Sequence, residues 1–468
     1  TNAYLSEQRT FNRVASLALR DFAPGATFYA RGLEMDVDGL DLGTQTSLIR
    51  PWAWCDACGY ACDLAPAGNE ITVAACPRCG SAQIADAAQR FEVVEMTRVL
   101  SEVRRDESRI NDSSDERKKT RFVIAVAPDL NPANVTRQWA VTGGTFGIAH
   151  YRSMDIRWLN AGRASVSGMS ARSVAGQQLP NSMFRVCAGC GKADSHANTN
   201  KRHEHRPWCR YRDASTEDAR AVGLTRTLTT QAVVLSLPLQ VTLGDTFAVP
   251  SLAAAVMLGL RERMGGNPDH LEVATIPAPI SGGAQAEVRD ALLLHDIVPG
   301  GTGYLADLAE PEEMWHLLAT ALRVVAECPC KDENRMACHR CLLPFPFGLG
   351  ADRLSRLAAE RHLRTILGMS APLGPDEVPP PDAMGWQVTE GPVGSGSNES
   401  HLELLFRKVF EDRLKALNAT VKEKPGPSGN RLTITFGGDQ RVWTLTPQEM
   451  SHGSMPDFVL RSNDPGIP

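Results

Sequence analysis

The chain has 468 residues, of which 43% are hydrophobic and 22% charged, and its formal net charge is −5 at pH 7. This length exceeds what one hydrophobic core serves, and no stretch approaches the roughly 18 uninterrupted apolar residues of a membrane helix. The N-terminus also lacks the basic and apolar segments of a signal peptide. We therefore expect a multidomain cytoplasmic protein without membrane contact, in which the twelve cysteines bind metal rather than form disulfides.

A helix, a hairpin and a zinc ribbon are expected in residues 1–100. The helix would run from Glu7 to Asp21, and the alternation in ATFYARGLEMDVDGLDLG favours a strand hairpin. The ribbon has the spacing Cys-x2-Cys-x17-Cys-x2-Cys, and Gly59 or Gly80 follows each pair. Thiolates on such turns bind a tetrahedral zinc, and the glycine allows the positive φ that the returning chain needs. The expected ligands are Cys55, Cys58, Cys76 and Cys79.

Strands are expected on both sides of a segment of mixed charge. Alternation at Phe91–Met96 predicts one strand, and RFVIAVAP and MDIRWLNAG predict two more. Between them, SEVRRDESRINDSSDERKKT carries many residues of both signs. Such mixed charge favours a solvated loop over a phosphate-binding segment.

A second metal site is expected in CAGCGKADSHANTNKRHEHRPWC. Its candidate ligands are Cys187, Cys190 and Cys209, with His196, His203 or His205 as the fourth. The spacing His205-x3-Cys209 is the more usual one for a zinc knuckle, although His203-x5-Cys209 also lies in the allowed range. We take His205 as the fourth ligand and keep His203 as the alternative.

Residues 216–327 alternate between expected strands and helices. TQAVVLSLPL predicts a strand, SLAAAVMLGLRERMGG predicts a helix that opens at Ser251, and Leu271–Pro277 and Val288–His295 predict two further strands. A strand ends at Asp296, and a second long helix is expected from about Pro311, with acidic residues in its first turn.

A glycine-rich turn, Pro299 to Gly303, follows Asp296. Its amides and the following helix could cradle a phosphate, but a tight turn that needs positive φ explains the glycines equally well. The turn lacks the lysine of a P-loop, and no G-x-x-x-x-G-K-[ST] occurs in the chain. The sequence therefore contains no recognisable nucleotide-hydrolysing motor.

A third metal site is expected in ECPCKDENRMACHRCLLPF. Its four thiols, Cys328, Cys330, Cys338 and Cys341, lie too close together in the sequence to be explained by packing in a reducing compartment. Three sites of four ligands use eleven cysteines and one histidine and leave only Cys62. Because a catalytic zinc keeps an open position for water, we expect all three to be structural and no catalytic residues among them.

The C-terminal part is expected to be a linker followed by a small α/β domain. After the Pro-, Gly- and Ser-rich residues 371–398, a helix is predicted from Ser400 to Leu417, with strands in RLTITF and RVWTLTP and then MPDFVLR. Glu403 and Asp457 are similar to the first acidic positions of a PD-(D/E)xK or Vsr-like nuclease. Such enzymes hold Mg²⁺ with clustered carboxylates and use a lysine on the next strand. That strand would follow Pro468, so we expect a truncated nuclease-like domain.

HDIVPGGTGYLADL, the helix after it and CPC…ACHRCLLPF together resemble the C-terminal zinc-binding domain of MrfA-like DEAD/DEAH-box helicases. This domain also occurs in helicase-related components of bacterial anti-phage systems such as DISARM and Druantia, and its metal ligands match the four cysteines of the third site. Upstream, APGATFYARG, WCDACGYAC…CPRCG, RINDSSDER, WLNAG and CAGC…HRPWC are similar to Druantia-type helicases in the same order, so the resemblance covers residues 10–370.

The resemblance implies a superfamily-two, ATP-dependent DNA helicase. Its motor, which would hold ATP and Mg²⁺, is expected N-terminal to these residues in the same polypeptide, since the chain begins with Thr1 rather than methionine. We expect a multidomain α/β (α+β) fold with inserted zinc ribbon and zinc knuckle modules and a partial restriction-endonuclease-like α/β domain. The expected parts are a mixed α/β region (1–175, ribbon 55–79), the knuckle (176–215), the MrfA-like zinc-binding domain (216–370), the linker (371–398) and the truncated nuclease-like domain (399–468).

Two functions remain open besides that nuclease. In the first, the region binds single-stranded or unwinding DNA through the basic segment KRHEHRPWCRYR, and Trp54 and Tyr211 offer further aromatic rings for stacking on bases. Its expected contacts are Lys201, Arg202, Arg206, Trp208, Arg210 and Arg212. In the second, the region is a scaffold that docks defence-system subunits, and the basic residues near the clusters only pair with thiolates. Those residues are Arg78, Lys192, Arg206, Arg210, Lys331, Arg335 and Arg340.

Overall fold

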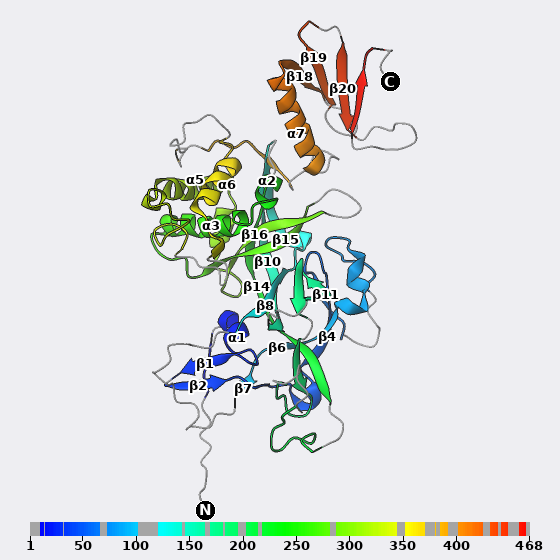
Figure 1. The fold of residues 1–468 in the computed structure, drawn as a ribbon, viewed down its shortest axis with the longest axis vertical. Coiled ribbons are helices and arrows are strands. Elements are labelled where there is room, and N and C mark those ends of the chain that lie inside the picture. Colours follow the sequence, from blue (N-terminus) through cyan, green and yellow to red (C-terminus); the bar gives the residue numbers. More distant parts are fainter. Residues whose placement is uncertain are drawn as a thin grey trace, which may run out of the picture. The chain divides into compact units, whose positions relative to one another are not determined.

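Figure 1 shows the helices and strands of this computed structural model. Its chain divides into two compact units. The first comprises Thr1–Pro77, Ser81–Asp129 and Asp155–Leu228, and the second comprises Arg78–Gly80, Leu130–Met154 and Thr229–Pro468. The described residues are 10–13, 15–30, 32–65, 73–101, 120–142, 146–163, 169–180, 183–194, 203–213, 218–280, 287–343, 352–369, 380, 384–391, 401–424, 431–438, 441–447 and 458–464.

The first unit begins with a short helix and a hairpin. Helix α1 spans Ala15–Asp21, and strands β1 (Thr27–Ala30) and β2 (Leu33–Asp36) pair antiparallel. At the open end of the hairpin the Thr27 hydroxyl donates to Asp36 Oδ1 at 2.7 Å. The predicted hairpin is confirmed. The helix is shorter than predicted: its expected start, Glu7, lies outside the described residues, but residues 10–13 are described and are not helical, and Phe11 packs on the ring of Phe28 in the hairpin instead.

A mixed sheet makes up most of the first unit. Strand β6 runs antiparallel to β4 and parallel to β14, and β8 runs antiparallel to the second part of β10. The three strands predicted from alternation upstream of the second metal site are confirmed as β6, β8 and β10. The strands of this sheet are β4 (Ile49–Trp54), β5 (Ala61–Asp63), β6 (Arg90–Glu95), β8 (Phe122–Pro128), β13 (Phe184–Cys187) and parts of β10 (Gly147–Arg163) and β14 (Ala219–Ser236). Two small pairs lie beside it, β3 (Gly39–Leu40) with β7 (Val99–Leu100) and β11 (Met169–Val174) with β12 (Gln177–Pro180).

The two faces of this sheet carry separate cores. On β10, Leu159 packs with Trp54 and Phe91, whereas the next residue toward the N-terminus, Trp158, packs with the cluster that contains Leu224. This is the period of two that a strand imposes on its side chains. The sheet therefore buries both faces, and its strands hold the cysteine turns at their ends.

The second unit contains a long hairpin and a helical layer. Strands β15 (Leu271–Ile280) and β16 (Glu287–Asp296) pair antiparallel along their length, and β16 also pairs with the second part of β14. Strand β9 (Val135–Val141) pairs with the first part of β10. The helices are α2 (Leu239–Thr242), α3 (Ala248–Met264), α4 (Tyr304–Leu308), α5 (Pro311–Glu327) and α6 (Arg356–Ile366).

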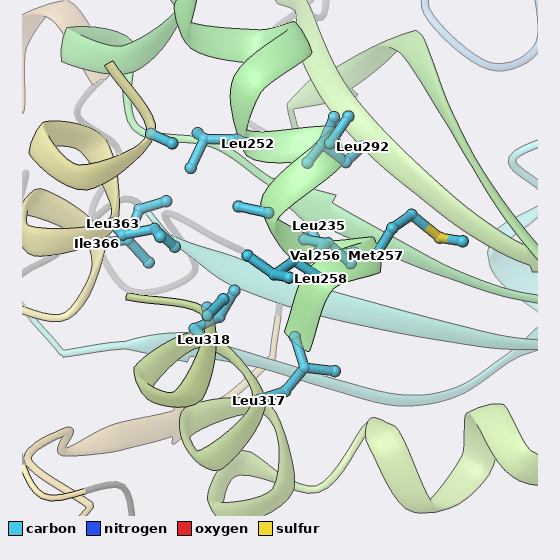
Figure 2. Close-up of a cluster of buried hydrophobic side chains, with 14 of the residues drawn as sticks. Leu235, Leu252, Val256, Met257, Leu258, Leu292, Leu317, Leu318, Leu363 and Ile366 are labelled. Carbon is cyan, nitrogen blue, oxygen red and sulfur yellow. The ribbon is translucent and has the colours of Figure 1, made fainter. Parts of the chain in front are cut away.

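Residues 251–260 of helix α3 are all buried, because α5, α6 and β15 contact the helix. Figure 2 shows Leu252, Val256 and Leu258 of α3 among side chains from α5, α6, β14 and β16. A Cβ on Gly259 would lie 2.6 Å from the carbonyl oxygen of Leu317, so this glycine lets α3 and α5 approach closely. None of the helices in the described residues combines the length and apolar character that crossing a bilayer requires.

The start of α3 differs from the prediction. The helix begins at Ala248, and Ser251 lies inside it, fully buried. The Ser251 hydroxyl accepts the N–H of Ser355, the residue that caps α6 through its own hydroxyl. Ser251 therefore joins two helices rather than starting one, and only the tertiary fold reveals that partner.

Part of the predicted linker at 371–398 belongs to the second unit's core, which corrects that prediction. Strand β17 (Val388–Glu390) pairs with β9, and Trp386 is buried with its Nε1–H donating to Ile366 O at 3.1 Å. The Trp386 ring lies 5.7 Å from that of Trp139 and 5.1 Å from that of Trp315, measured between ring centroids. The aromatic contacts account for why this Pro- and Gly-rich segment is packed.

The C-terminal residues form a helix and an antiparallel meander. Helix α7 spans His401–Ala416, and the strand order is β18-β19-β20-β21. Leu414 of α7 packs against Leu432, Ile434 and Leu445 of the sheet. The predicted helix and its three predicted strands are confirmed, and β18 was not predicted. The strand bounds are β18 Ala419–Lys424, β19 Arg431–Phe436, β20 Val442–Pro447 and β21 Phe458–Ser462.

Candidate metal centres

Two cysteine turns form the first cluster. Cys55 and Cys58 lie in the turn of the β4–β5 hairpin, and the Cys55 N–H donates to Tyr60 O at 2.7 Å. Cys76 and Cys79 lie in a second turn, and the Sγ atoms of Cys58 and Cys76 are 3.5 Å apart. All four thiols are buried, and their sulfurs lie within 4.8 Å of one another.

Glycines and one hydrogen bond shape these turns. Gly59 and Gly80 have φ of 81° and 76°, as the sequence predicts for a chain that turns back after each cysteine pair. Ser81 Oγ donates to Asp56 Oδ1 at 2.9 Å and so links the second turn to the first. The bond between Ser81 and Asp56 has no signature in the cysteine spacing.

The second cluster contains His205 rather than His203. His205 Nδ1 lies 3.6 Å from Cys209 Sγ and 4.0 Å from Cys190 Sγ, and Cys187 Sγ lies 3.7 Å from Cys209 Sγ. His203 instead directs Nε2 to the carbonyl oxygen of Lys192 at 3.0 Å. The third candidate, His196, lies outside the described residues.

The third cluster lies at the C-terminal end of α5. Cys328 caps that helix, Cys330 is in the 3₁₀ turn Pro329–Lys331, and Cys338 and Cys341 are in the turn that follows. The sulfur of Cys338 is 3.4 Å from that of Cys328 and 3.8 Å from that of Cys341. Backbone amides also point at the sulfurs, since Arg340 N–H donates to Cys338 Sγ.

The donor sets fit zinc. With a Zn–S bond of about 2.3 Å, the edge of a regular tetrahedron is about 3.8 Å. Five Sγ–Sγ separations lie between 3.4 and 3.9 Å, far longer than a disulfide bond, and all ligand atoms of each cluster lie within 4.8 Å of one another. All twelve cysteines lie in the described residues and none forms a disulfide. Three structural zinc sites therefore match the three clusters, as expected from the spacing.

The crowded thiols do not ionise together without a cation. Hydrogen bonds to Cys55 and Cys76, followed by burial, raise the pKa of Cys58 well above its usual range. Burial raises the pKa of Cys187 to about 12 and that of Cys341 to about 11. Burial acts on Cys338 too, yet the amide of Arg340 and the neighbouring thiols outweigh it and lower the pKa to about 7. A bound divalent cation supplies the charge that four thiolates need in one place.

Cys62 stays apart from the clusters. It lies on β5, half-buried, with its thiol donating to Asp63 O at 3.7 Å. Burial raises the pKa of this thiol, which makes it a poor ligand and a poor nucleophile.

Two of the residues predicted to face DNA are buried, which corrects those predictions. The Arg206 side chain is only 3% exposed, and its Nη2 donates to Asp38 Oδ1 at 2.6 Å. A guanidinium this buried is not available to a DNA phosphate. Trp54 is fully buried in the core of the first unit, so its ring is not accessible to a base.

Three of the other predicted contacts lie close to Cys209 in the sequence. Trp208, Arg210 and Arg212 are exposed, and the Arg210 guanidinium lies 4.7 Å from the centre of the Tyr211 ring. Lys201 and Arg202 lie outside the described residues. The structure thus leaves an exposed tryptophan and two exposed arginines on one short stretch of chain.

The sequence does not predict the contacts that hold the turns of the second cluster in place. Asp38 accepts the N–H of Ala193 through its carbonyl oxygen and the guanidinium of Arg206 through its carboxylate. Gly191 has φ of 69°, and a Cβ there would lie 1.9 Å from Leu40 O. The glycine directly after Cys190 repeats the ribbon pattern and could have indicated this turn. Nothing in the sequence pairs Asp38 with Arg206.

The acidic residues of the predicted nuclease-like domain are only partly described. Glu403 lies in the first turn of α7, and Asp457 lies outside the described residues, just before β21.

The third cluster lies at the C-terminal end of the part of the chain that matches a known domain. Residues 252–342 match the MrfA Zn-binding domain. The match begins inside α3 and ends one residue after Cys341, so it includes β15, β16, α5 and the whole third cluster. The predicted resemblance to that domain is confirmed over these residues.

No curated protein matches the chain. Among solved structures, the chain is similar to the crystal structure of the DUF1998 helicase MrfA bound to DNA, with 12% identity and a TM-score of 0.35. The aligned part covers 76% of this chain and 31% of that helicase chain. The likeness is too weak to establish a shared fold.

Proposed function

We propose that these residues form a zinc-stabilised, DNA-binding accessory region of an ATP-dependent superfamily-two DNA helicase. The observation that carries the proposal is the match of residues 252–342 to the MrfA Zn-binding domain, which contains the buried third cluster. The motor, with its ATP and Mg²⁺, would precede the region in the same polypeptide. The abundance of cysteine clusters that suit zinc supports a cytoplasmic location, where thiols stay reduced.

The DNA-binding surface would be the segment from Trp208 to Arg212. Its arginines are exposed, and the adjacent Cys209 belongs to the second cluster. Guanidinium groups bind phosphates without regard to base sequence, which suits a region that handles any strand leaving a motor. The zinc would hold this short loop in shape, because the loop is too small to have a core of its own.

Charge reversal at this surface tests the proposal. In the double variant Arg210→Glu and Arg212→Glu, we expect single-stranded DNA to bind less tightly. The slope of log binding constant against log salt concentration should become shallower by roughly 0.7 for each phosphate contact that is lost. Zinc content should stay unchanged. Fluorescence anisotropy over a range of salt concentrations measures both affinity and slope.

A control variant with the same charge change separates local from general electrostatics. Arg98 and Arg353 are exposed residues outside the segments that form the three clusters, and the variant Arg98→Glu with Arg353→Glu should leave the affinity nearly unchanged. If both double variants weaken binding equally, the surface is wrong. If the unaltered chain does not bind DNA even at low salt, the DNA-binding function is wrong.

A protein-interaction scaffold is the second candidate. It is favoured by the pairing of Arg206 with Asp38 and of Lys192 with Glu204, since both pairs remove cations from a phosphate-binding role. Under this proposal the chain would bind partner subunits of a defence system, and it would co-purify with DNA only when those subunits are present. Co-purification with and without nuclease treatment separates the two candidates.

We also propose, at a finer level, that the helicase acts in anti-phage defence and that residues 399–468 begin a nuclease-like domain. Support for the second point is the order of a helix, α7, followed by an antiparallel meander. In the full-length protein, Mg²⁺-dependent cleavage of DNA should be lost in Glu403→Ala and in Asp457→Ala. Cleavage that persists in both variants would contradict it.

A further inference from the structure

Trp208 lies in a turn that is held at both ends. Cys209 N–H donates to Arg206 O at 2.9 Å, which closes a four-residue turn with Pro207 at its second position. Proline fixes φ there at a value that such turns require. One end of the turn is held by the buried Arg206, which pairs with Asp38, and the other by Cys209 in the second cluster. The backbone of Trp208 is therefore rigid.

The side chain of Trp208 nevertheless projects into solvent. It is 68% exposed, the highest value among the large hydrophobic side chains of the described residues. An indole offers a wide apolar face and loses little conformational entropy on binding, because it has only two side-chain torsions. A rigid turn that exposes such a ring favours stacking on a planar group of a binding partner over packing in a core.

Two guanidinium groups are tied back to the same loop. Arg210 lies over the Tyr211 ring and donates to the Tyr211 hydroxyl at 2.7 Å. Arg212 donates to Pro207 O at 3.4 Å, which keeps its charge beside the turn. The partner of the Trp208 face should therefore be both flat and anionic.

We infer that Trp208 stacks on an unpaired base of single-stranded DNA while Arg210 and Arg212 contact the flanking phosphates. The inference rests on the proposed function and narrows it to one kind of substrate. In duplex DNA each base is already stacked on its neighbours, so a surface ring finds free base faces only on a single strand. Stacking on an aromatic side chain does not depend on base identity, which suits a helicase accessory region.

An abasic strand provides the sharpest test, because it has the phosphates of single-stranded DNA without the bases. The whole chain is titrated into a labelled oligothymidine, an abasic oligonucleotide of equal length and the corresponding duplex. In Trp208→Ala we expect affinity for the oligothymidine to fall about tenfold. Affinity for the abasic strand and for the duplex should not change.

Two matched variants show that the ring itself is responsible. Trp208→Phe keeps an aromatic face and should retain most of the affinity for oligothymidine, while Leu243→Ala removes another exposed apolar side chain and should have no effect. Arg212→Ala should weaken binding to the oligothymidine and abasic strands alike. It should also make the slope of log binding constant against log salt concentration shallower by roughly 0.7. Zinc content, measured on each variant, should match that of the unaltered chain.

The outcomes distinguish stacking at Trp208 from the proposed DNA-binding function. If Trp208→Ala binds all ligands as the unaltered chain does, or loses affinity for the abasic strand equally, stacking at Trp208 is overturned while DNA binding stands. If the unaltered chain binds none of the three ligands, the proposed function fails, and the inference fails with it.

Discussion

At the residue scale, the cluster ligands are fixed mostly by neighbours along the chain. A Cys-x-x-Cys turn places two sulfurs on one side, and the glycine after it adopts the positive φ seen at Gly59, Gly80 and Gly191. Such local geometry can be inferred from spacing. Spacing favours His205 as the fourth ligand but leaves His203 open, because both spacings reach a zinc ion; the partner of each ring decides between them.

The two histidines make a matched pair of variants. His205→Ala removes a ligand atom from the second cluster, so we expect the chain to lose one of its three zinc ions. His203→Ala leaves the four ligand atoms in place and removes the hydrogen bond to Lys192 O, whose loss should cost about 1 kcal/mol in the free energy of unfolding. Elemental analysis after dialysis measures the zinc, and urea unfolding measures the stability.

The ligand assignment depends on the difference between these variants. Retention of all zinc in His205→Ala, with loss in His203→Ala, would exchange their roles. Unchanged zinc in both would remove histidine from the second site altogether.

At the element scale, apolar periodicity indicates which segments are helices and strands but not how closely they pack. The apolar pattern of SLAAAVMLGLRERMGG predicts the helix α3, and the alternation in MDIRWLNAG predicts a strand within β10. The close approach of α3 to α5 depends on Gly259, which lies against the backbone of Leu317. A glycine inside a helix gives no indication of which helix it meets.

A methyl group at this contact should force the two helices apart. We expect Gly259→Ala to lower the free energy of unfolding by about 1–3 kcal/mol, despite the better helix propensity of alanine. The control is Gly266→Ala, just beyond the end of α3, where a Cβ would meet no atom within 4 Å. Urea unfolding of both variants measures the difference. A Gly259→Ala protein as stable as the unaltered chain would show that α3 and α5 tolerate a wider separation.

The prediction of a linker at 371–398 is wrong for the residues around Trp386, which pack in the core of the second unit. The proline and glycine content of residues 371–398 favours an extended segment, yet Trp386 packs among the rings of Trp139 and Trp315. The cost of exposing a tryptophan outweighs the flexibility of its neighbours. Because Trp139 and Trp315 are distant in sequence, the contact could not be read from the linker itself.

At the scale of the whole molecule, metal binding and folding are one equilibrium. Zinc binds deprotonated thiols and neutral histidine, so its release is accompanied by proton uptake at eleven cysteines and one histidine. Stability that depends on zinc is therefore present at neutral and alkaline pH and is lost as pH falls. The clusters also lie at the ends of strands and helices, so release should loosen those elements.

Metal content and its pH dependence test this coupling. We expect three zinc ions per chain near neutral pH and progressive loss between about pH 7 and pH 5, together with a lower midpoint of thermal unfolding. A chelator at neutral pH should lower the midpoint in the same way, and added zinc should restore it. Well under three ions per chain, or a midpoint that the chelator leaves unchanged, would contradict structural roles for all three sites.

The sequence alone determined the three cysteine groups, most strands and helices, and the resemblance of the segment around the third cluster to a zinc-binding domain, which the match over residues 252–342 confirms. These features depend on residues close together in the chain, where covalent geometry limits the choices. Only the tertiary structure decided that Arg206 is buried against Asp38, that Trp54 is buried in the core and that Trp208 projects from a rigid turn. The exposure of a side chain depends on which distant elements cover it, and that is set by the packing of the whole fold.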